Sequence, residues 1–174
     1  ALDNAAVFQK YDGSMQFFAQ PSVFDRESDS NVALSAYTAD AFDVLRQLGY
    51  QVPQDVDGSV RAFLADTARK KSADHDMDRA IAAASGTSAA ETEGLRSRWD
   101  KLQLPGRIAL ARAMARQGSP ATAETFAALL DAAPKHGGAR SVAGDDGWWT
   151  PWLGSDLREQ LALHKVQVDK PEYE

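Results

Sequence analysis

The sequence predicts an all-α protein built from helical hairpins. Apolar residues recur every three or four positions in several segments, and Gly or Pro residues stand between these segments. Val and Ile are sparse and no segment shows a convincing alternating strand pattern, so we expect minimal sheet content. Hydrophobic residues make up 44% of the 174 residues and charged residues 25%, a balance typical of a chain that folds around one core.

The first predicted hairpin joins a helix from about Asn31 to Leu48 with a helix from about Asp55 to Arg69. Asn31 can cap the first helix, and Gly49 follows its last apolar residue, where a left-handed residue can end a helix. Pro53 lies in the short joint, which favours antiparallel helices. The residues expected to face the core are Leu34, Tyr37, Ala41, Val44, Leu45 and Leu48 in the first helix and Val60, Phe63, Leu64, Thr67 and Ala68 in the second. Tyr37 is therefore predicted to be a core residue.

The second predicted hairpin runs from about Leu104 to Arg116 and from about Ala121 to Ala133, with Gly118 at its turn. Its inward positions are Ile108, Ala111 and Ala115 in the first helix and Ala123, Phe126 and Leu130 in the second. A less regular pair, Met77–Ala84 and Ala89–Leu102, lies between the two hairpins, and a last helix is predicted from about Ser155 to Val166. We therefore expect one helical domain over residues 1–166, followed by a polar tail over residues 167–174.

Two similar loops precede helices in this pattern. One contains Asp12-Gly13 and then Phe17-Phe18, and the other contains Asp146-Gly147 and then Trp148-Trp149 and Trp152. Each is interpreted as a tight Asp-Gly turn, an aromatic plug and a capped helix. The recurrence indicates a helical array whose helices are introduced by the same kind of loop.

Three short segments resemble the helical thioester-bearing domain of the alpha-2-macroglobulin superfamily, in particular its bacterial members. Gln9-Lys10-Tyr11-Asp12-Gly13-Ser14 is similar to the family's glutamine and Asp-Gly turn, Leu34-Ser35-Ala36-Tyr37 to its Leu-Thr-Ala-Tyr helix opening, and Leu48-Gly49-Tyr50-Gln51-Val52-Pro53 to its Gly-Tyr-x-Val-Pro joint. The Leu104–Ala115 helix and the Asp146–Arg158 segment resemble later helices and a second Asp-Gly loop. Similar loops also occur in other α/α toroids, among them terpenoid cyclases and prenyltransferases.

The resemblance implies that the hairpins form part of an α/α toroid within a periplasmic or extracellular protease-trapping protein. The implied partners are proteases, bound through the parent protein, and neighbouring domains of the same chain. The family's Cys-x-Glu-Gln thioester motif is missing and the chain contains no cysteine, so these residues cannot form a thioester. Such a motif is expected upstream of Ala1, or the protein lacks it. The second loop, Asp146–Gly154, also lacks the histidine that assists thioester transfer in some vertebrate members.

Charge and spacing argue against several other kinds of site. The net charge of −6 disfavours nucleic acid as a general partner, and the short basic run Arg69-Lys70-Lys71 is interpreted as the solvated end of a helix. No run of apolar residues is long enough for insertion into a membrane. Asp74–Asp78 begins like a calcium loop, but Arg79 and Ser85 occupy the positions of its required Gly and Glu. His75, His136 and His164 have no metal-ligand spacing. We therefore expect no cofactor and no metal.

The remaining candidate for chemistry is the pair Asp145-Asp146 beside Trp148, Trp149 and Trp152, because acids beside aromatic residues can line a carbohydrate cleft. Adjacent acids on one loop do not form the opposed pair that glycoside hydrolysis needs, so we favour a loop plug or a domain interface for the three Trp residues. The leading hypothesis is a non-catalytic helical domain of a protease inhibitor. The alternatives are an α/α-toroid enzyme or carbohydrate-binding module, and a helical-repeat adaptor that binds a protein partner.

Overall fold

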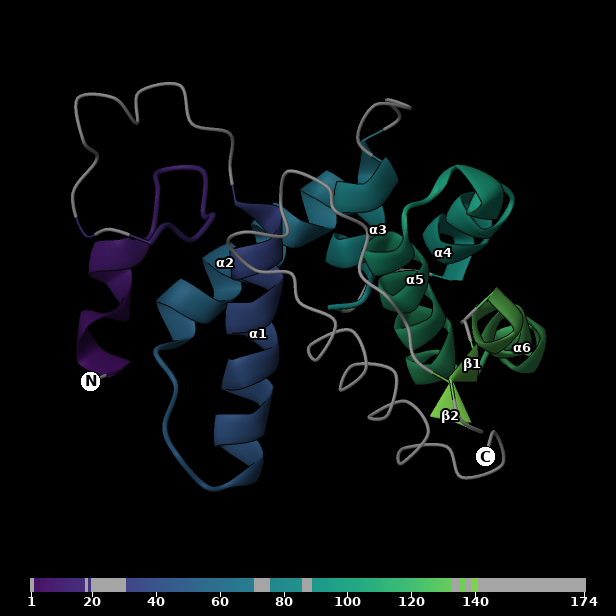
Figure 1. The fold of residues 1–174 in the computed structure, drawn as a ribbon. Helices are drawn as coiled ribbons and strands as arrows, with labels where there is room; N and C mark the ends of the chain where they lie inside the picture. Colours follow the sequence, from purple (N-terminus) through teal and green to yellow (C-terminus); the bar gives the residue numbers. More distant parts are fainter. Residues whose placement is uncertain are drawn as a thin grey trace.

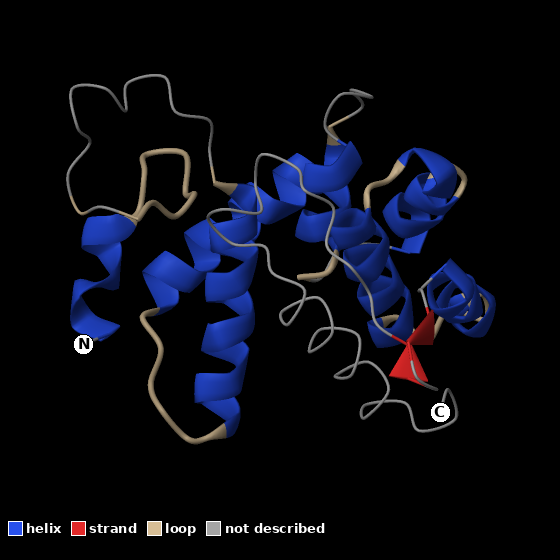
Figure 2. Ribbon diagram, in the orientation of Figure 1, coloured by secondary structure: helices blue, strands red, loops and turns tan. Residues whose placement is uncertain are grey.

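The computed structural model describes residues 2–17, 19, 31–70, 76–85, 89–132, 135–136 and 139–140. In this part of the chain the predicted all-α fold is confirmed, and the only strands are two short ones that pair antiparallel (Figure 2). The elements, in chain order, are η1 (Leu2–Phe8), α1 (Val32–Gln47), α2 (Gln54–Arg69), α3 (Asp76–Ala83), α4 (Ala89–Arg96), η4 (Trp99–Lys101), α5 (Leu104–Arg116), α6 (Thr122–Ala132), β1 (Lys135–His136) and β2 (Ala139–Arg140).

The helices follow one another across the molecule, from η1 at one side to α6 at the other (Figure 1). The short helix α3 is central, because it packs against α1, α2 and α5. The α1–α2 hairpin and the α5–α6 hairpin both form as predicted, and α4 contacts α3 and α5. The closed ring of an α/α toroid remains a prediction.

Two groups of buried side chains form the core. The larger lies among α1, α2, α3 and α5 and includes many alanines, and the smaller lies between α5 and α6 around Ile108, Phe126 and Leu129. Trp99 is partly buried and packs against both groups, so it joins them. The predicted inward faces of α2 and α5 are confirmed, since Val60, Phe63, Leu64, Thr67 and Ala68 and also Ile108, Ala111 and Ala115 are buried.

The helix ends agree closely with the capping residues read from the sequence. The Asn31 side chain accepts a hydrogen bond of 2.8 Å from the amide of Leu34, which satisfies a backbone donor of the first turn. Gly49 and Gly118 have φ values of 85° and 64°, so each adopts the left-handed conformation after its helix.

The predicted helix over Ala89–Leu102 is shorter in the structure than expected. It ends at Arg96, and Trp99–Lys101 forms a 3-10 turn instead. The Ser97 hydroxyl donates to the Gly94 carbonyl at 2.8 Å, and the Arg98 amide donates to the Leu95 carbonyl at 3.0 Å. Side-chain competition for the backbone and a tighter last turn therefore end this helix early.

The predicted inner face of α1 is only partly correct, because Leu34 and Leu45 pack against the larger core group but other predicted residues do not. Tyr37 has 60% of its surface exposed, and Val44 and Leu48 are exposed as well, whereas Leu34, Ala41 and Leu45 are half-buried. The buried residues of α1 are instead Val32, Ser35, Ala36, Ala39 and Phe42. Small residues on this face let α1 approach α2 and α3 closely, because large side chains at the same positions would hold the helices apart.

Two smaller expectations are also corrected. Ala123 of α6 is exposed, and the buried positions of that helix are Thr122, Thr125, Phe126 and Leu129, with Leu130 half-buried. Phe17, one of the two residues of the predicted aromatic plug, is exposed, and the buried apolar residue of the first Asp-Gly loop is Met15. Phe18, the other residue of the predicted plug, lies outside the described residues. The Asp146-Gly147 loop, Trp148, Trp149, Trp152, the helix over Ser155–Val166 and the tail over residues 167–174 lie outside the described residues.

We predict that Phe42→Ala lowers the free energy of unfolding by about 3–5 kcal/mol, because it empties a site in the core. Tyr37→Ala should cost about 1 kcal/mol or less, because most of its side chain lies in solvent. Urea denaturation followed by circular dichroism measures both values. Equal losses in the two variants would show that Tyr37 is a core residue after all.

Candidate functional site

The first Asp-Gly loop is a compact turn held by its own hydrogen bonds. Gly13 has a φ of 88°, and its amide donates to the Lys10 carbonyl at 3.0 Å. Asp12 Oδ1 accepts hydrogen bonds from the Ser14 amide at 3.0 Å and from the Ser14 hydroxyl at 2.7 Å. The predicted tight turn is thus confirmed, and Gly13 suits it because L side chains rarely adopt this conformation.

This loop lies directly against helix α2. A Cβ atom added to Gly13 would be 2.5 Å from the carbonyl oxygen of Ser59, so only glycine fits there without a shift of the backbone. Gln9 Nε2 donates to the carbonyl oxygens of Gly13 at 3.2 Å and of Val56 at 3.1 Å. The glutamine side chain therefore ties the loop to the first turn of α2.

The same loop also contacts helix α1. The Met15 amide donates to Ser35 Oγ at 2.9 Å, and this hydroxyl donates in turn to the Asn31 carbonyl at 2.8 Å. Ser35 is fully buried, and Met15 also forms a backbone bridge with Asn31. We call the contact of residues 9–15 with Asn31, Ser35, Val56 and Ser59 the loop seat.

The loop seat joins only some of the residues that the sequence singled out. Asp12, Gly13 and Ser35 lie in it, and Ala36 is buried on the same face of α1 as Ser35. Gly49, Tyr50 and Pro53 lie in the joint at the opposite end of α1, where Tyr50 is exposed and its amide donates to the Leu45 carbonyl. Tyr37 is exposed on α1, away from the buried face.

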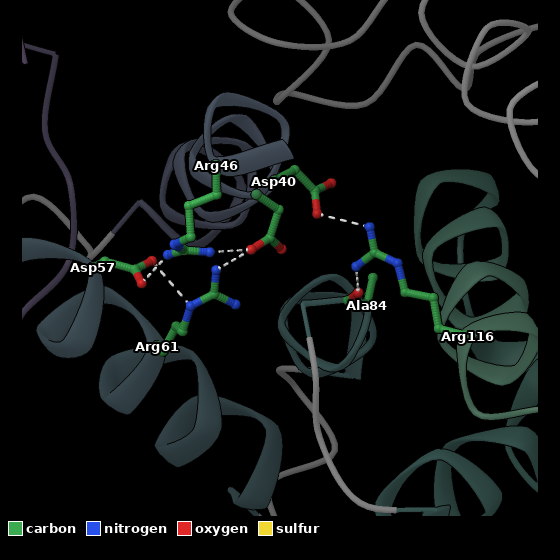
Figure 3. Close-up of polar contacts among 7 residues, drawn as sticks. Asp40, Arg46, Asp57, Arg61, Ala84 and Arg116 are labelled. Atoms are coloured by element: carbon green, nitrogen blue, oxygen red, sulfur yellow. Dashed lines mark hydrogen bonds and ion pairs between the residues drawn. The ribbon is translucent and has the colours of Figure 1, made fainter. Parts of the chain in front are cut away.

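Four charged residues connect α1 with α2 beside the core (Figure 3). Asp43 accepts from Arg46 and from Arg61 at 2.6 Å each, and Arg61 also bonds Asp57 at 2.9 Å. Arg46 pairs with Asp57 as well, which closes the ring of four. These side chains are partly exposed, so the ring should contribute little to the free energy of unfolding. We expect its main effect to be on the orientation of α1 relative to α2.

Asp40 connects α1 with α5. Its carboxylate accepts from Arg112 at 2.8 Å and from Arg116 at 3.0 Å. Figure 3 shows the contact with Arg116, which also donates to the Ala84 carbonyl at the end of α3. Burial raises the pKa of Asp40, but the two guanidinium groups outweigh it and hold this pKa below the ordinary value of 3.8. The carboxylate therefore stays ionised and links three helices.

Asp40, Asp43 and Asp57 all take part in contacts between helices. The carboxylates of Asp40, Asp43 and Asp57 are each paired with two arginines. Asp40, whose pKa lies below its ordinary value, is a poor proton donor near neutral pH. Within the described ranges, no group of three or more His, Cys, Asp or Glu residues could hold a metal ion. No helix among the described residues is both long and apolar enough to cross a bilayer.

The sequence analysis did not identify these charged contacts. The spacing from Asp43 to Arg46 and from Asp57 to Arg61 is that of pairs on one helix face, so the pairs within each helix were open to prediction. The contacts between helices depend on how the hairpin packs. The acids Asp145 and Asp146, and the three Trp residues beside them, lie outside the described residues.

Comparison of the chain with protein-family models, with curated proteins and with solved structures gives no match.

We predict that Gly13→Ala lowers the free energy of unfolding by about 2–4 kcal/mol, because it combines left-handed strain with a clash against α2. Gly49→Ala is the matched control, since its φ of 85° is nearly the same but nothing lies within 4 Å of the added Cβ. It should cost only about 1 kcal/mol. Urea denaturation of both variants tests the loop seat, and equal losses would mean that the seat contact is absent.

We predict that Asp40→Asn lowers the free energy of unfolding by about 1–3 kcal/mol near pH 7, because two charged hydrogen bonds are lost. Since the folded pKa lies below 3.8, this difference should persist above about pH 4 and shrink as the pH falls through the folded pKa. Denaturation between pH 3 and pH 7 measures the difference.

The control for this experiment is Asp66→Asn, which alters an exposed ion pair with Arg69 on α2. It should change the free energy of unfolding by about 0.5 kcal/mol or less. An Asp40→Asn effect that grows below pH 4 would contradict the assigned role of the carboxylate.

Proposed function

We propose that this chain is a non-catalytic helical domain of a bacterial alpha-2-macroglobulin-like protease inhibitor, where it acts as scaffold and moving part of the protease trap. The observation that supports this proposal is the loop seat. It joins two of the three sequence segments that carry the resemblance, the glutamine with its Asp-Gly turn and the opening of the following helix. The proposed surroundings are the periplasm or the extracellular space.

The contacts of the loop seat explain why particular residue types occur in it. Gly13 is required by its φ and by the nearby Ser59 carbonyl, and Ser35 supplies a small buried hydroxyl for the Met15 amide. The Gln9 side chain donates a hydrogen bond to the Val56 carbonyl of α2. If the motifs resembled the family only by chance, we would not expect two motifs about 20 residues apart in the sequence to form one hydrogen-bonded unit.

The geometry also fits a scaffold that holds neighbouring segments in place. Helix η1 comes directly before the loop, and its residues Leu2 and Ala5 pack against the main core. The seat therefore sets where the chain that enters from the N-terminal side meets the α1–α2 hairpin (Figure 1). In the proposed trap this domain positions or shields the thioester, where the protein has one.

A second candidate, the helical adaptor, is favoured by a different observation. Val44, Leu48 and Tyr50 expose apolar surface along α1 and the joint that follows it, and surfaces of this kind often bind proteins. The hypothesis of a toroid enzyme or a carbohydrate-binding module depends on Asp146 and the Trp residues, which lie outside the described residues.

The proposed function predicts a specific pattern of protease inhibition by the complete gene product that contains this chain. A protease mixed with it should lose most of its activity on a large protein substrate but keep its activity on a small chromogenic peptide, because an enclosed protease remains open to small molecules. Gly13→Ala should weaken this effect through loss of the loop seat, and Gly49→Ala, with the same backbone strain, should retain it.

Three results would count against the proposal. Unchanged cleavage of both substrates would contradict trapping and favour the adaptor. Equal loss on the large and the small substrate would indicate an ordinary active-site inhibitor. Hydrolysis of a polysaccharide that Asp146→Asn abolishes would establish an enzyme.

A further inference from the structure

The Asp12-Gly13 pair of the loop seat is a chemically reactive sequence. The backbone nitrogen after an aspartate lies near Cγ of its side chain, and glycine has no Cβ atom to hinder their approach. Asp12 is exposed to solvent, whereas Gly13 and Ser14 are buried. Water can therefore reach the aspartate, while the residue that supplies the reacting nitrogen is covered.

The reaction open to this pair is the isomerisation of aspartate to isoaspartate. The Gly13 nitrogen loses its proton and attacks Cγ of Asp12, so that a C–N bond forms, a C–O bond of the carboxyl group breaks and one water leaves. The product is a cyclic succinimide. Water then adds to the ring and breaks one of its C–N bonds. When the bond to the backbone carbonyl carbon breaks, the main chain runs through Cβ and Cγ, and no oxidant or reductant is consumed.

The closed loop seat opposes this reaction. The Gly13 amide donates to the Lys10 carbonyl at 3.0 Å, so its proton is held and its nitrogen cannot turn toward Cγ. Asp12 Oδ1 is held by the Ser14 amide at 3.0 Å and by the Ser14 hydroxyl at 2.7 Å. The Ser59 carbonyl oxygen would be 2.5 Å from a Cβ atom on Gly13, so the backbone has little room to rotate there. The ring can therefore close only after the loop leaves its seat.

We propose that Asp12 is a modification site, where aspartate isomerises to isoaspartate at a rate set by the opening of the loop seat. Local opening of a protein takes seconds or less, whereas succinimide formation is far slower, so the loop opens and closes many times before it reacts. The rate of modification is then the rate of an open Asp-Gly peptide multiplied by the fraction of molecules whose seat is open.

Isomerisation changes the loop seat permanently. The main chain gains a methylene group between Asp12 and Gly13, and the remaining carboxylate is attached directly to Cα. The acceptor for Ser14 is thus displaced, and Gly13 no longer fits against Ser59. The inference goes beyond the proposed function and does not depend on it, since the same chemistry applies to the loop seat of a trap, an adaptor or an enzyme.

The test is incubation of the full chain near pH 7, with isoaspartate measured over time by liquid chromatography and electron-transfer mass spectrometry. Ser35→Ala removes the hydroxyl that accepts from the Met15 amide, so the seat should open more often and isoaspartate at Asp12 should form about tenfold faster than in the parent chain. Gln9→Ala, which removes the side-chain bonds to Gly13 and to α2, is a second seat variant with the same expected direction.

Two controls separate opening of the seat from general unfolding. Thr38 Oγ1 donates to the Leu34 carbonyl at 2.9 Å, as Ser35 Oγ does to a carbonyl one turn earlier, but Thr38 is not part of the loop seat. Thr38→Ala should therefore leave the rate at Asp12 unchanged. Asp57-Gly58 is a second Asp-Gly pair, placed inside α2, and its rate in Ser35→Ala should equal that in the parent chain.

Three outcomes would overturn the inference. Equal amounts of isoaspartate at Asp12, or none, in the parent chain and in both seat variants would show that opening of the seat does not set the rate. Formation in the parent chain as fast as in a synthetic peptide of residues 9–16 would show that the seat gives no protection. Equal acceleration by Thr38→Ala, or a matching rise at Asp57, would show that the reaction follows general unfolding.

Discussion

Close packing through small side chains on α1 is the constraint on which the described structure depends. Ser35, Ala36 and Ala39 are buried where this helix meets α2 and α3, and Ala80 of α3 and Ala113 of α5 belong to the same core. Small residues at the contact let helix axes approach closely. As a result the short helix α3 packs on both sides, against the first hairpin and against α5.

The orientation of α1 that follows from this packing determines the other features. It places the Ser35 hydroxyl at the Met15 amide, and so creates the loop seat. It also turns Asp40 toward α5 and Asp43 toward α2, where arginines meet them. The same rotation leaves Val44 and Leu48 outside. The loop seat, the ion pairs and the exposure of Val44 and Leu48 therefore all follow from which face of α1 is buried.

Sequence reasoning succeeded where the determinants are local and failed where they are not. Caps such as Asn31 and Gly49 located the helices, because each acts within one turn of its helix. Part of the predicted inner face of α1 was wrong because periodicity gives weight to large apolar residues such as Tyr37, whereas three of the five buried positions of this helix hold Ser or Ala. For the loop seat, the resemblance pointed to Gly13 and Ser35, but their contacts span 20 residues or more and depend on packing.

The most direct test of the central claim is the reactivity of single cysteines along α1, which is simple to measure because the chain has no native cysteine. Ala36→Cys and Ala39→Cys lie on the buried face, and Gln47→Cys lies at an exposed position of the same helix. Our account predicts that thiol reagents label the first two only at the rate of global unfolding, while Gln47→Cys reacts as fast as a free thiol. Rapid labelling at positions 36 and 39 under native conditions would contradict it.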